Sequence, residues 1–208
     1  MSGRPQAAYE KSVFINCPFD PEFQDQMLAT VFSVAAHGLS SRSALETDGS
    51  SEPRFLRIFK TLSQSKYSIH DLSRCGGEGP ENLARFNMPL ELGAACALRF
   101  ERNQSARPHN LLILVPEGFA YQRFVSDLAG FDPGRHSQTV ESVIREVCAW
   151  LPLQEDTIGP YPSALQIFEA FPRFRNEVSH LRSQALGKHS WTDLLLAASR
   201  TVPNAMEG

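Results

Sequence analysis

The chain has 208 residues, of which 42% are hydrophobic and 21% are charged, and these fractions are ordinary for one globular domain with a real core and a C-terminal extension. Its formal net charge of −3 argues against a general nucleic-acid-binding protein, because such proteins carry an excess of basic residues. The N-terminus lacks the apolar run of a signal peptide, and no stretch approaches the roughly 18 apolar residues of a membrane helix, so we expect a cytoplasmic protein without a nucleic-acid or membrane partner.

The first third of the chain alternates short strand-like runs with helical patterns. Residues 21–37 and 55–62 have apolar side chains at helical spacing, which predicts two amphipathic helices. Ser73–Arg85 contains three glycines and a proline and therefore predicts a loop. We expect strands at Ser12–Asn16, Arg42–Glu46 and Tyr67–Leu72.

The rest of the chain continues the same alternation. Residues 88–98 are almost all apolar and predict a tightly packed helix, and Asn110–Val115 is the clearest buried strand. Helical patterns follow at Tyr121–Leu128 and Val140–Leu151. Strands that alternate with helices predict a mostly parallel sheet, so we expect a flavodoxin-like three-layer α/β domain of four to five strands over residues 12–151.

A helical extension is predicted after this domain, at residues 161–201. Pro152, Gly159, Pro160 and Pro162 indicate a linker, and helical patterns cover 165–186 and 191–199. These helices either pack back on the sheet domain or form an oligomer interface.

The expected fold also indicates where a ligand would bind. Ligands of doubly wound sheets bind beyond the carboxyl ends of the strands, which directs attention to residues 16–20, 47–53 and 71–85 and to the start of the helix near Met88. Phe19 could stack on a base or nicotinamide ring, and Asp20 could in addition cap the helix that begins at Pro21. The candidate substrate-binding residues are Asn16, Cys17, Pro18, Phe19, Asp20, Ser73, Arg74, Asn87 and Met88.

Glu91 is the first candidate for chemistry, because it is the only charged residue between Arg85 and Arg99. Two interpretations are open. If Asn87 or Met88 caps the helix, Glu91 lies near the third helical position, where a glutamate favours the helix dipole and can close a capping box. If the helix begins beside the strand ends, the same carboxylate could attack, or stabilise, an oxocarbenium-like C1′ of ribose.

Asp71 is the second candidate, at the predicted end of a strand. It could hydrogen-bond ribose hydroxyls there, or it could cap a turn with Ser73. We interpret the neighbouring His70 as a structural residue. The four cysteines form no C-x-x-C pair and the six histidines show no metal-ligand spacing, so we expect reduced thiols and neither a metal nor a cofactor.

Three segments together resemble a known superfamily. VFINCPFD (13–20), YSIHDLSR (67–74) and RFNMPLELG (85–93) are similar to segments of the superfamily that joins nucleoside 2-deoxyribosyltransferases and Toll/interleukin-1 receptor (TIR) domains, over about residues 12–151. In the transferases a G-P-F-like loop follows the first strand, and here Cys17-Pro18-Phe19 is similar to it. Asp71 matches a strand-end aspartate, and Glu91-Leu92-Gly93 matches a motif whose glutamate is the nucleophile.

The resemblance implies an enzyme with Glu91 and Asp71 as catalytic residues. Arg85–Pro89 stands where the transferases have a D-x-G-T-like segment, whereas catalytic TIR domains use a glutamate on the corresponding helix to cleave NAD. The expected function is therefore cleavage of the N-glycosidic bond of NAD, as a hydrolase or a cyclic ADP-ribose-type signal synthase in bacterial antiphage defence. NAD would be the substrate rather than a cofactor, and a homo-oligomer and a downstream effector protein are expected partners. A non-catalytic nucleotide-sensing adaptor and a nucleoside 2-deoxyribosyltransferase are the alternatives.

Overall fold

Five parallel strands form the central sheet of the computed structural model, which describes residues 8–46, 52–75, 77–78, 83–84, 86–118, 121–123, 125–128, 130–185 and 190–204. The strand order is β2-β1-β3-β6-β7, and every neighbouring pair is parallel. The strands are β1 (Ser12–Asn16), β2 (Ser40–Arg42), β3 (Tyr67–Asp71), β6 (Asn110–Pro116) and β7 (Gly134–His136). This order is that of a flavodoxin-like doubly wound sheet, and it confirms the expected fold class.

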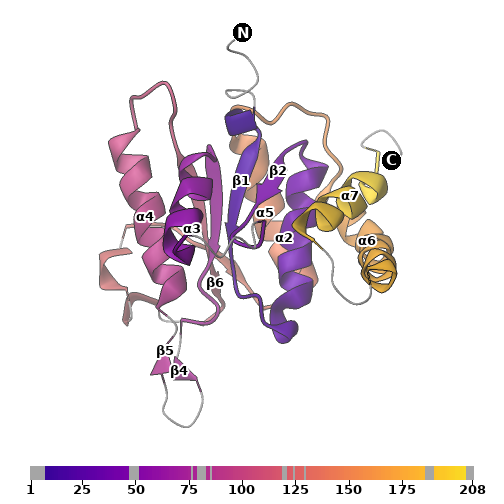
Figure 1. Cartoon of the computed structure of the whole chain (residues 1–208), viewed down its shortest axis with the longest axis horizontal. Coiled ribbons are helices and arrows are strands. Elements are labelled where there is room, and N and C mark those ends of the chain that lie inside the picture. Colours follow the sequence, from indigo (N-terminus) through magenta and orange to yellow (C-terminus); the bar gives the residue numbers. More distant parts are fainter. Residues whose placement is uncertain are drawn as a thin grey trace.

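Helices cover both faces of this sheet and form a three-layer α/β fold (Figure 1). One face is covered by α2 (Gln24–Ala36), which follows the short helix η1 (Pro21–Phe23), and by α5 (Val140–Trp150). The other face is covered by α3 (Arg54–Ser63) and α4 (Asn87–Glu101). In Figure 1 the layers follow one another from α3 and α4 on the left, through the sheet, to α2 and α5.

The alternation of side chains along β1 divides the core in two. Val13 and Ile15 pack in the cluster on the α2 and α5 side, whereas Phe14 packs in the cluster on the α3 and α4 side. All five residues of β1 are buried. A strand that is buried on both faces reads in the sequence as a continuous apolar run, which is why this strand could be predicted from its residues.

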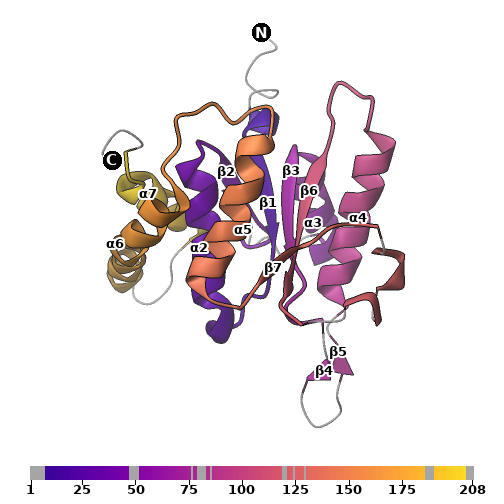
Figure 2. The same cartoon turned by 180° about the vertical axis from the view of Figure 1, so that it is seen from behind.

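The C-terminal helices α6 (Ala164–Gln184) and α7 (Trp191–Thr201) pack back on the sheet domain as a further layer beyond α2 (Figure 2). Phe174 of α6 stacks on Phe32 of α2 with the ring centroids 4.6 Å apart and the ring planes 4° from parallel. Trp191 of α7 donates a hydrogen bond of 2.9 Å from Nε1 to the carbonyl of Ser41 in the edge strand β2. Among the helices that the structure describes, none is both long and apolar enough to cross a bilayer.

Several local predictions were wrong in detail. The second strand ends at Arg42, and residues 42–46 form a turn because the Glu46 carboxylate accepts hydrogen bonds from Arg42 Nε and from the Ser43 amide. The predicted loop Ser73–Arg85 contains an antiparallel pair, β4 (Gly77–Glu78) and β5 (Leu83–Ala84). Residues 47–51 lie outside the described residues. The pattern at 121–128 forms two short 3₁₀ helices, η2 (Tyr121–Arg123) and η3 (Ser126–Leu128).

We expect Phe174→Ala to destabilise the whole protein by about 3–5 kcal/mol, because it removes a fully buried aromatic ring from the core between α6 and α2. The matched control is Phe168→Ala on the same helix, where the side chain is 37% exposed, and its expected cost is about 1 kcal/mol. Urea denaturation followed by circular dichroism measures both. Equal losses for the two variants would contradict the packing described for α6.

Candidate functional site

The carboxyl ends of β1 and β3 lie side by side at the point where the strand order reverses. Asn16, the last residue of β1, is in register with His70 of β3. The first turn of α4 approaches the same point, since Asn16 hydrogen-bonds the Met88 carbonyl. A cleft of about 240 Å³ opens there, where doubly wound folds bind ligands. Its lining residues are Asn16, Cys17, Pro18, Phe19, Asp20, Arg54, Asn87, Met88 and Glu91.

A second hollow, of about 220 Å³, adjoins this cleft between α3 and α4. Arg54, Asn87 and Glu91 line both spaces, whereas Phe55, Ile58 and Leu90 line only the second. The cleft at the strand ends is lined by amide, carboxyl and guanidinium groups, and the second hollow is mainly apolar. Ligand sites typically combine an apolar wall with a few oriented polar groups, and Glu91 lies where the two parts meet.

Glu91 does not cap its helix, so the capping interpretation was wrong. The N-cap of α4 is Phe86, which makes no side-chain capping bond, and Glu91 is the fifth residue of the helix rather than the third. Its side chain is buried on the same face as Met88 and Leu92, and the residue is 8% exposed. Within the described part of the chain, its carboxylate accepts no hydrogen bond.

Burial has a chemical consequence for Glu91. Loss of hydration disfavours the carboxylate and raises the pKa of Glu91 to about 7, although the charge of Arg54 acts in the opposite direction. The side chain is therefore divided between its acid and its carboxylate near neutral pH. A carboxyl group in this state can stabilise positive charge, attack as a nucleophile or transfer a proton.

Asn16 presents an oriented acceptor to the cleft. Its Nδ2 lies 3.1 Å from the Met88 carbonyl oxygen and 3.0 Å from His70 Nδ1. The carbonyl oxygen can only accept, so the atom facing it must be the amide nitrogen, and both amide protons are then used. The remaining atom of the amide, Oδ1, has no partner among the described residues and is free to accept a hydrogen bond in the cleft.

The contact with His70 continues as a buried row of hydrogen bonds along β3. His70 Nε2 lies 2.9 Å from Ser68 Oγ, which lies 2.9 Å from His109 Nε2, and His109 Nδ1 lies 2.9 Å from the Ser65 carbonyl. Carbonyl acceptors at both ends fix the direction: Asn16 donates to His70, His70 to Ser68, Ser68 to His109 and His109 to Ser65. Both imidazoles are neutral in this row, in agreement with burial, which lowers the pKa of His70 to about 3 and that of His109 to about 4.

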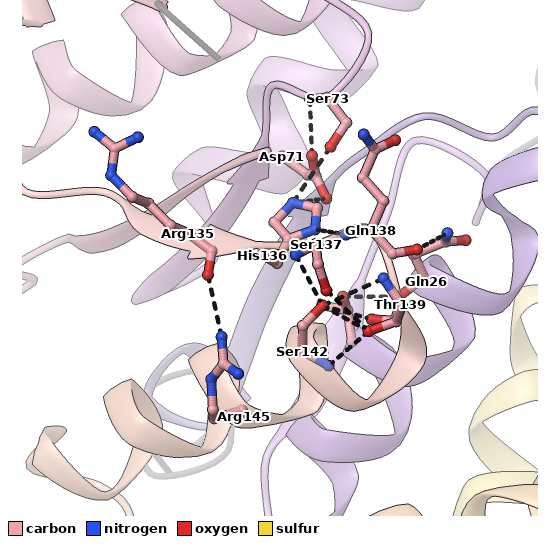
Figure 3. Close-up of polar contacts among 11 residues, drawn as sticks. Gln26, Asp71, Ser73, Arg135, His136, Ser137, Gln138, Thr139, Ser142 and Arg145 are labelled. Atoms are coloured by element: carbon pink, nitrogen blue, oxygen red, sulfur yellow. Dashed lines mark hydrogen bonds and ion pairs between the residues drawn. The ribbon is translucent and has the colours of Figure 1, made fainter. Parts of the chain in front are cut away.

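Asp71 is not brought into the cleft. Its Oδ1 accepts a hydrogen bond of 2.8 Å from the Ser73 amide, and its Oδ2 lies 3.4 Å from His136 Nε2 of β7. Figure 3 shows the His136 ring between Asp71 and Ser73 on one side and the Gln138 backbone on the other. Asp71 and Ser73 both contact Nε2, while the Gln138 amide donates to Nδ1, so this cluster lacks the geometry of a catalytic triad.

Arg74 also lies outside the cleft lining and connects the loops that follow β1 and β3. Its guanidinium forms ion pairs with Glu22 and, at 3.9 Å, with Asp20, and it lies over the ring of Phe23, 5.1 Å from the centroid. Asp20 is the N-cap residue of η1, as predicted, although its side chain makes no capping hydrogen bond there. Arg74 therefore helps to position the loop after β1, including Asp20, which lines the cleft.

Cys17 lines the cleft as an unreactive thiol. Burial raises its pKa well above the usual value, and the charges of Asp71 and Glu91 act in the same direction. Because the thiolate is the reactive form of cysteine, Cys17 contributes shape rather than nucleophilic chemistry.

The sequence did not indicate the residues of α3 that complete the site. Arg54, Phe55 and Ile58 belong to an ordinary amphipathic pattern, and nothing in their spacing distinguishes ligand contacts from core contacts. The one available signal was the position of α3 directly after a predicted strand-end loop. His136 was also missed, because the three residues of β7 have no apolar run.

No family model matches the chain, and a search of curated proteins finds no relative. Over the described ranges, no group of three or more histidine, cysteine, aspartate or glutamate side chains is arranged to hold a metal ion.

Replacing Glu91 with glutamine should stabilise the protein at neutral pH and above. The pKa of Glu91 is raised from about 4.5 to about 7, so between these values the folded protein holds a proton that the unfolded chain has lost. Stability therefore falls as the pH rises through this window. At 1.4 kcal/mol for each pKa unit, the cost above pH 7 is about 3 kcal/mol.

Urea denaturation between pH 5 and pH 8 measures this difference, and the advantage of Glu91→Gln should vanish towards the acid end. The matched control is Glu169→Gln at an exposed position of α6, which makes the same substitution outside the buried site. A Glu91→Gln protein that is less stable than wild type at pH 8 would contradict the burial described for Glu91.

Proposed function

We propose that this protein cleaves the N-glycosidic bond between nicotinamide and ribose in NAD, with Glu91 as the catalytic residue. The observation that carries the proposal is the position of Glu91: a buried carboxyl group, without a capping role, at the junction of a polar cleft and an apolar hollow. A buried carboxyl group without a hydrogen-bond partner reduces stability, and such groups are concentrated at functional sites. The resemblance of Glu91-Leu92-Gly93 to a catalytic motif supports the same residue.

The chemistry needs little from the protein beyond one carboxylate. Nicotinamide leaves from a cationic pyridinium, so the electron pair of the broken C–N bond returns to the ring nitrogen and the leaving group is neutral. Glu91, when ionised, stabilises the developing positive charge at C1′ or bonds to that carbon. Water then adds its oxygen to C1′ and releases a proton, giving ADP-ribose, or a hydroxyl or ring nitrogen of the same molecule adds and gives a cyclic product. Where Glu91 has bonded to C1′, that bond breaks in the same step and its electron pair returns to the carboxylate.

The polar cleft suits the ribose and phosphate groups of NAD, and the adjoining apolar hollow suits its nicotinamide ring. The Oδ1 atom of Asn16 is available to accept a hydrogen bond from a ribose hydroxyl. The hollow with Phe55 and Leu90 suits the flat nicotinamide ring, and Arg54, exposed at the edge of both spaces, can pair with a phosphate. Phe19, which also lines the cleft, offers a second ring for stacking.

A nucleotide-sensing role is the second candidate, and the position of Asp71 favours it. Asp71 was expected to act in the cleft beside Glu91, yet its carboxylate is bonded to Ser73 and His136. A site in which Asp71 does not assist Glu91 can bind a nucleotide and respond to it without turnover. Under this alternative, Glu91 and Arg54 serve recognition only.

We expect Glu91→Gln to lower NAD cleavage by at least about 100-fold, because positioned acid–base or nucleophilic groups contribute factors of this size or larger. Glu169→Gln should retain wild-type turnover and serves as the matched control. Chromatography of the reaction mixture measures nicotinamide release and separates ADP-ribose from a cyclic product. Equal turnover by the wild-type and Glu91→Gln proteins would exclude the role assigned to Glu91.

The pH profile tests the protonation state in which Glu91 acts. Its pKa is raised to about 7, so the reactive carboxylate becomes more abundant as the pH rises through neutrality. We expect kcat/KM for NAD to increase about tenfold per pH unit below pH 7 and to level off above it. A profile that falls through the same range would mean that the acid form of Glu91 is the active one.

Calorimetry distinguishes the enzyme from the sensor. Titration with NAD, ADP-ribose and nucleosides reports binding whether or not turnover occurs. Asn16→Ala should weaken the binding of ribose-containing ligands, because it removes the free acceptor and the two hydrogen bonds that hold the first turn of α4 at the cleft. Binding without release of nicotinamide, in every assembly state, would favour the sensor. Base exchange between deoxynucleosides without NAD cleavage would instead indicate a deoxyribosyltransferase.

A further inference from the structure

Helix α4 carries an exposed row of apolar and small residues along its outer side. The large side chains of this row are strongly exposed: Phe86 is 72%, Leu90 58% and Phe100 71% exposed. Intervals of four, three, four and three residues place the whole row on one narrow stripe, the spacing that pairs helices side by side. We call this row the α4 seam; it consists of Phe86, Leu90, Gly93, Ala97 and Phe100.

No neighbour within the described chain requires a glycine at position 93. A Cβ atom added at this position would meet no atom within 4 Å, and the backbone there is ordinary α-helix. Glycine in the middle of a helix is destabilising relative to alanine, so a packing or functional reason is expected. Close approach of a second backbone at the centre of the seam is such a reason.

The seam is complementary to itself when it is reversed. A two-fold axis at Gly93 places the glycine against its own copy, so two helices can approach closely at the centre. The same axis places Phe86 opposite the partner's Phe100, and it brings Leu90 to within one residue of the partner's Ala97 along the helix. Large side chains then face small ones beside the axis, and aromatic rings meet at both ends. We propose that the α4 seam is the interface with a second copy of this chain, with the two α4 helices antiparallel.

The apolar area around the seam is sufficient for a stable pair. Phe55 and Phe59 of α3, which packs beside α4, are 42% and 39% exposed and extend the patch. With about 200 Å² for a whole aromatic side chain, these two residues and the large residues of the seam expose on the order of 500 Å² per copy. A standard interface buries about 800 Å² per partner, so this patch supplies the greater part of one. In both views α4, with the segment of η2 and η3 beside its lower half, forms one flank of the molecule (Figure 1, Figure 2).

Charge also favours the antiparallel arrangement. Glu101, exposed at the C-terminal end of α4, comes opposite the N-terminal end of the partner helix under this symmetry. Arg54 lies at that end, beside Asn87 and Glu91. The interface therefore brings the carboxylate of Glu101 towards the partner's Arg54, once on each side of the axis, whereas a parallel pair would bring like ends together.

The proposed pair would also close the apolar hollow of the candidate site. Leu90 belongs both to the seam and to that hollow, so the partner helix would lie over the open side of the hollow. The interface goes beyond the proposed function and does not depend on it, because the oligomeric state can be measured without substrate.

Light scattering after gel filtration tests the interface with the full chain. Wild type should be a dimer, and Gly93→Leu should be a monomer, since its side chain blocks the approach of the partner helix. The Cβ atom of the new side chain meets no atom of the described chain within 4 Å, and leucine has the higher helix propensity, so circular dichroism should show a fold at least as stable as wild type. The matched control is Ile158→Glu at a position 82% exposed outside the seam, which should remain a dimer. A wild-type monomer up to about 100 μM, or a dimeric Gly93→Leu protein, would overturn the proposal, because standard interfaces give dissociation constants in the micromolar range or below.

Cross-linking tests the antiparallel register in a Cys96→Ser background. A mixture of Phe86→Cys and Phe100→Cys chains should form mixed disulfides on mild oxidation, and each chain alone should cross-link far less. The mixed disulfides should no longer form when Gly93→Leu is added to both chains. Cross-linking of each chain to its own copy, without mixed disulfides, would overturn the antiparallel arrangement.

Discussion

The two hydrogen bonds donated by the Asn16 amide hold the candidate site together. They connect the end of β1 to His70 of β3 and to the Met88 carbonyl in the first turn of α4. The N-terminal turn of α4 is thereby fixed against the sheet at the point where the strand order reverses. Glu91 lies one turn further along the same helix, so its distance from the strand ends follows from these two bonds. Without these two bonds, the described contacts would not fix the first turn of α4 at the carboxyl ends of β1 and β3.

Residues at the carboxyl edge of the sheet belong to different clusters on its two faces. His70 and Asp71 are neighbours in the chain, but side chains of a strand alternate between its faces. His70 faces α4 and joins the row that ends at Asn16, whereas Asp71 turns to the other side and reaches His136 and Ser73. The carboxyl groups of Asp71 and Glu91, which the sequence suggested as partners, thus belong to different clusters. Cys17 lies near both, and for that reason the charges of Asp71 and Glu91 each raise its pKa.

The parts of the fold that could be predicted are those in which a single segment carries the whole signal. β1 and β6 are buried on both faces and read as unbroken apolar runs, and the α4 segment is apolar almost throughout. β7 could not be predicted because it is a three-residue edge strand held by its pairing with β6. The end of β2 was misplaced because a side chain, that of Glu46, closes the following turn. Which residues meet at the site also depends on contacts between distant segments. Glu91 could be singled out because it is the one charged residue in an apolar segment, whereas Arg54 and Phe55 belong to an ordinary amphipathic pattern and could not.

Glu91 and Gly93 break local rules within one turn of one helix. Glu91 is an ionisable group in a position where burial disfavours its charge. Gly93 lies in the middle of the helix although only proline has a lower helix propensity than glycine, and no neighbour in the described chain requires a small residue there. Both lower the stability of α4, and neither loss is offset by a contact within the described chain. Natural sequences keep such conflicts at functional sites, because there a ligand or a partner supplies the missing interaction. The two residues face different directions, Glu91 towards the cleft and Gly93 towards the outer flank, so the helix that completes the site is also the one that would connect it to a second copy.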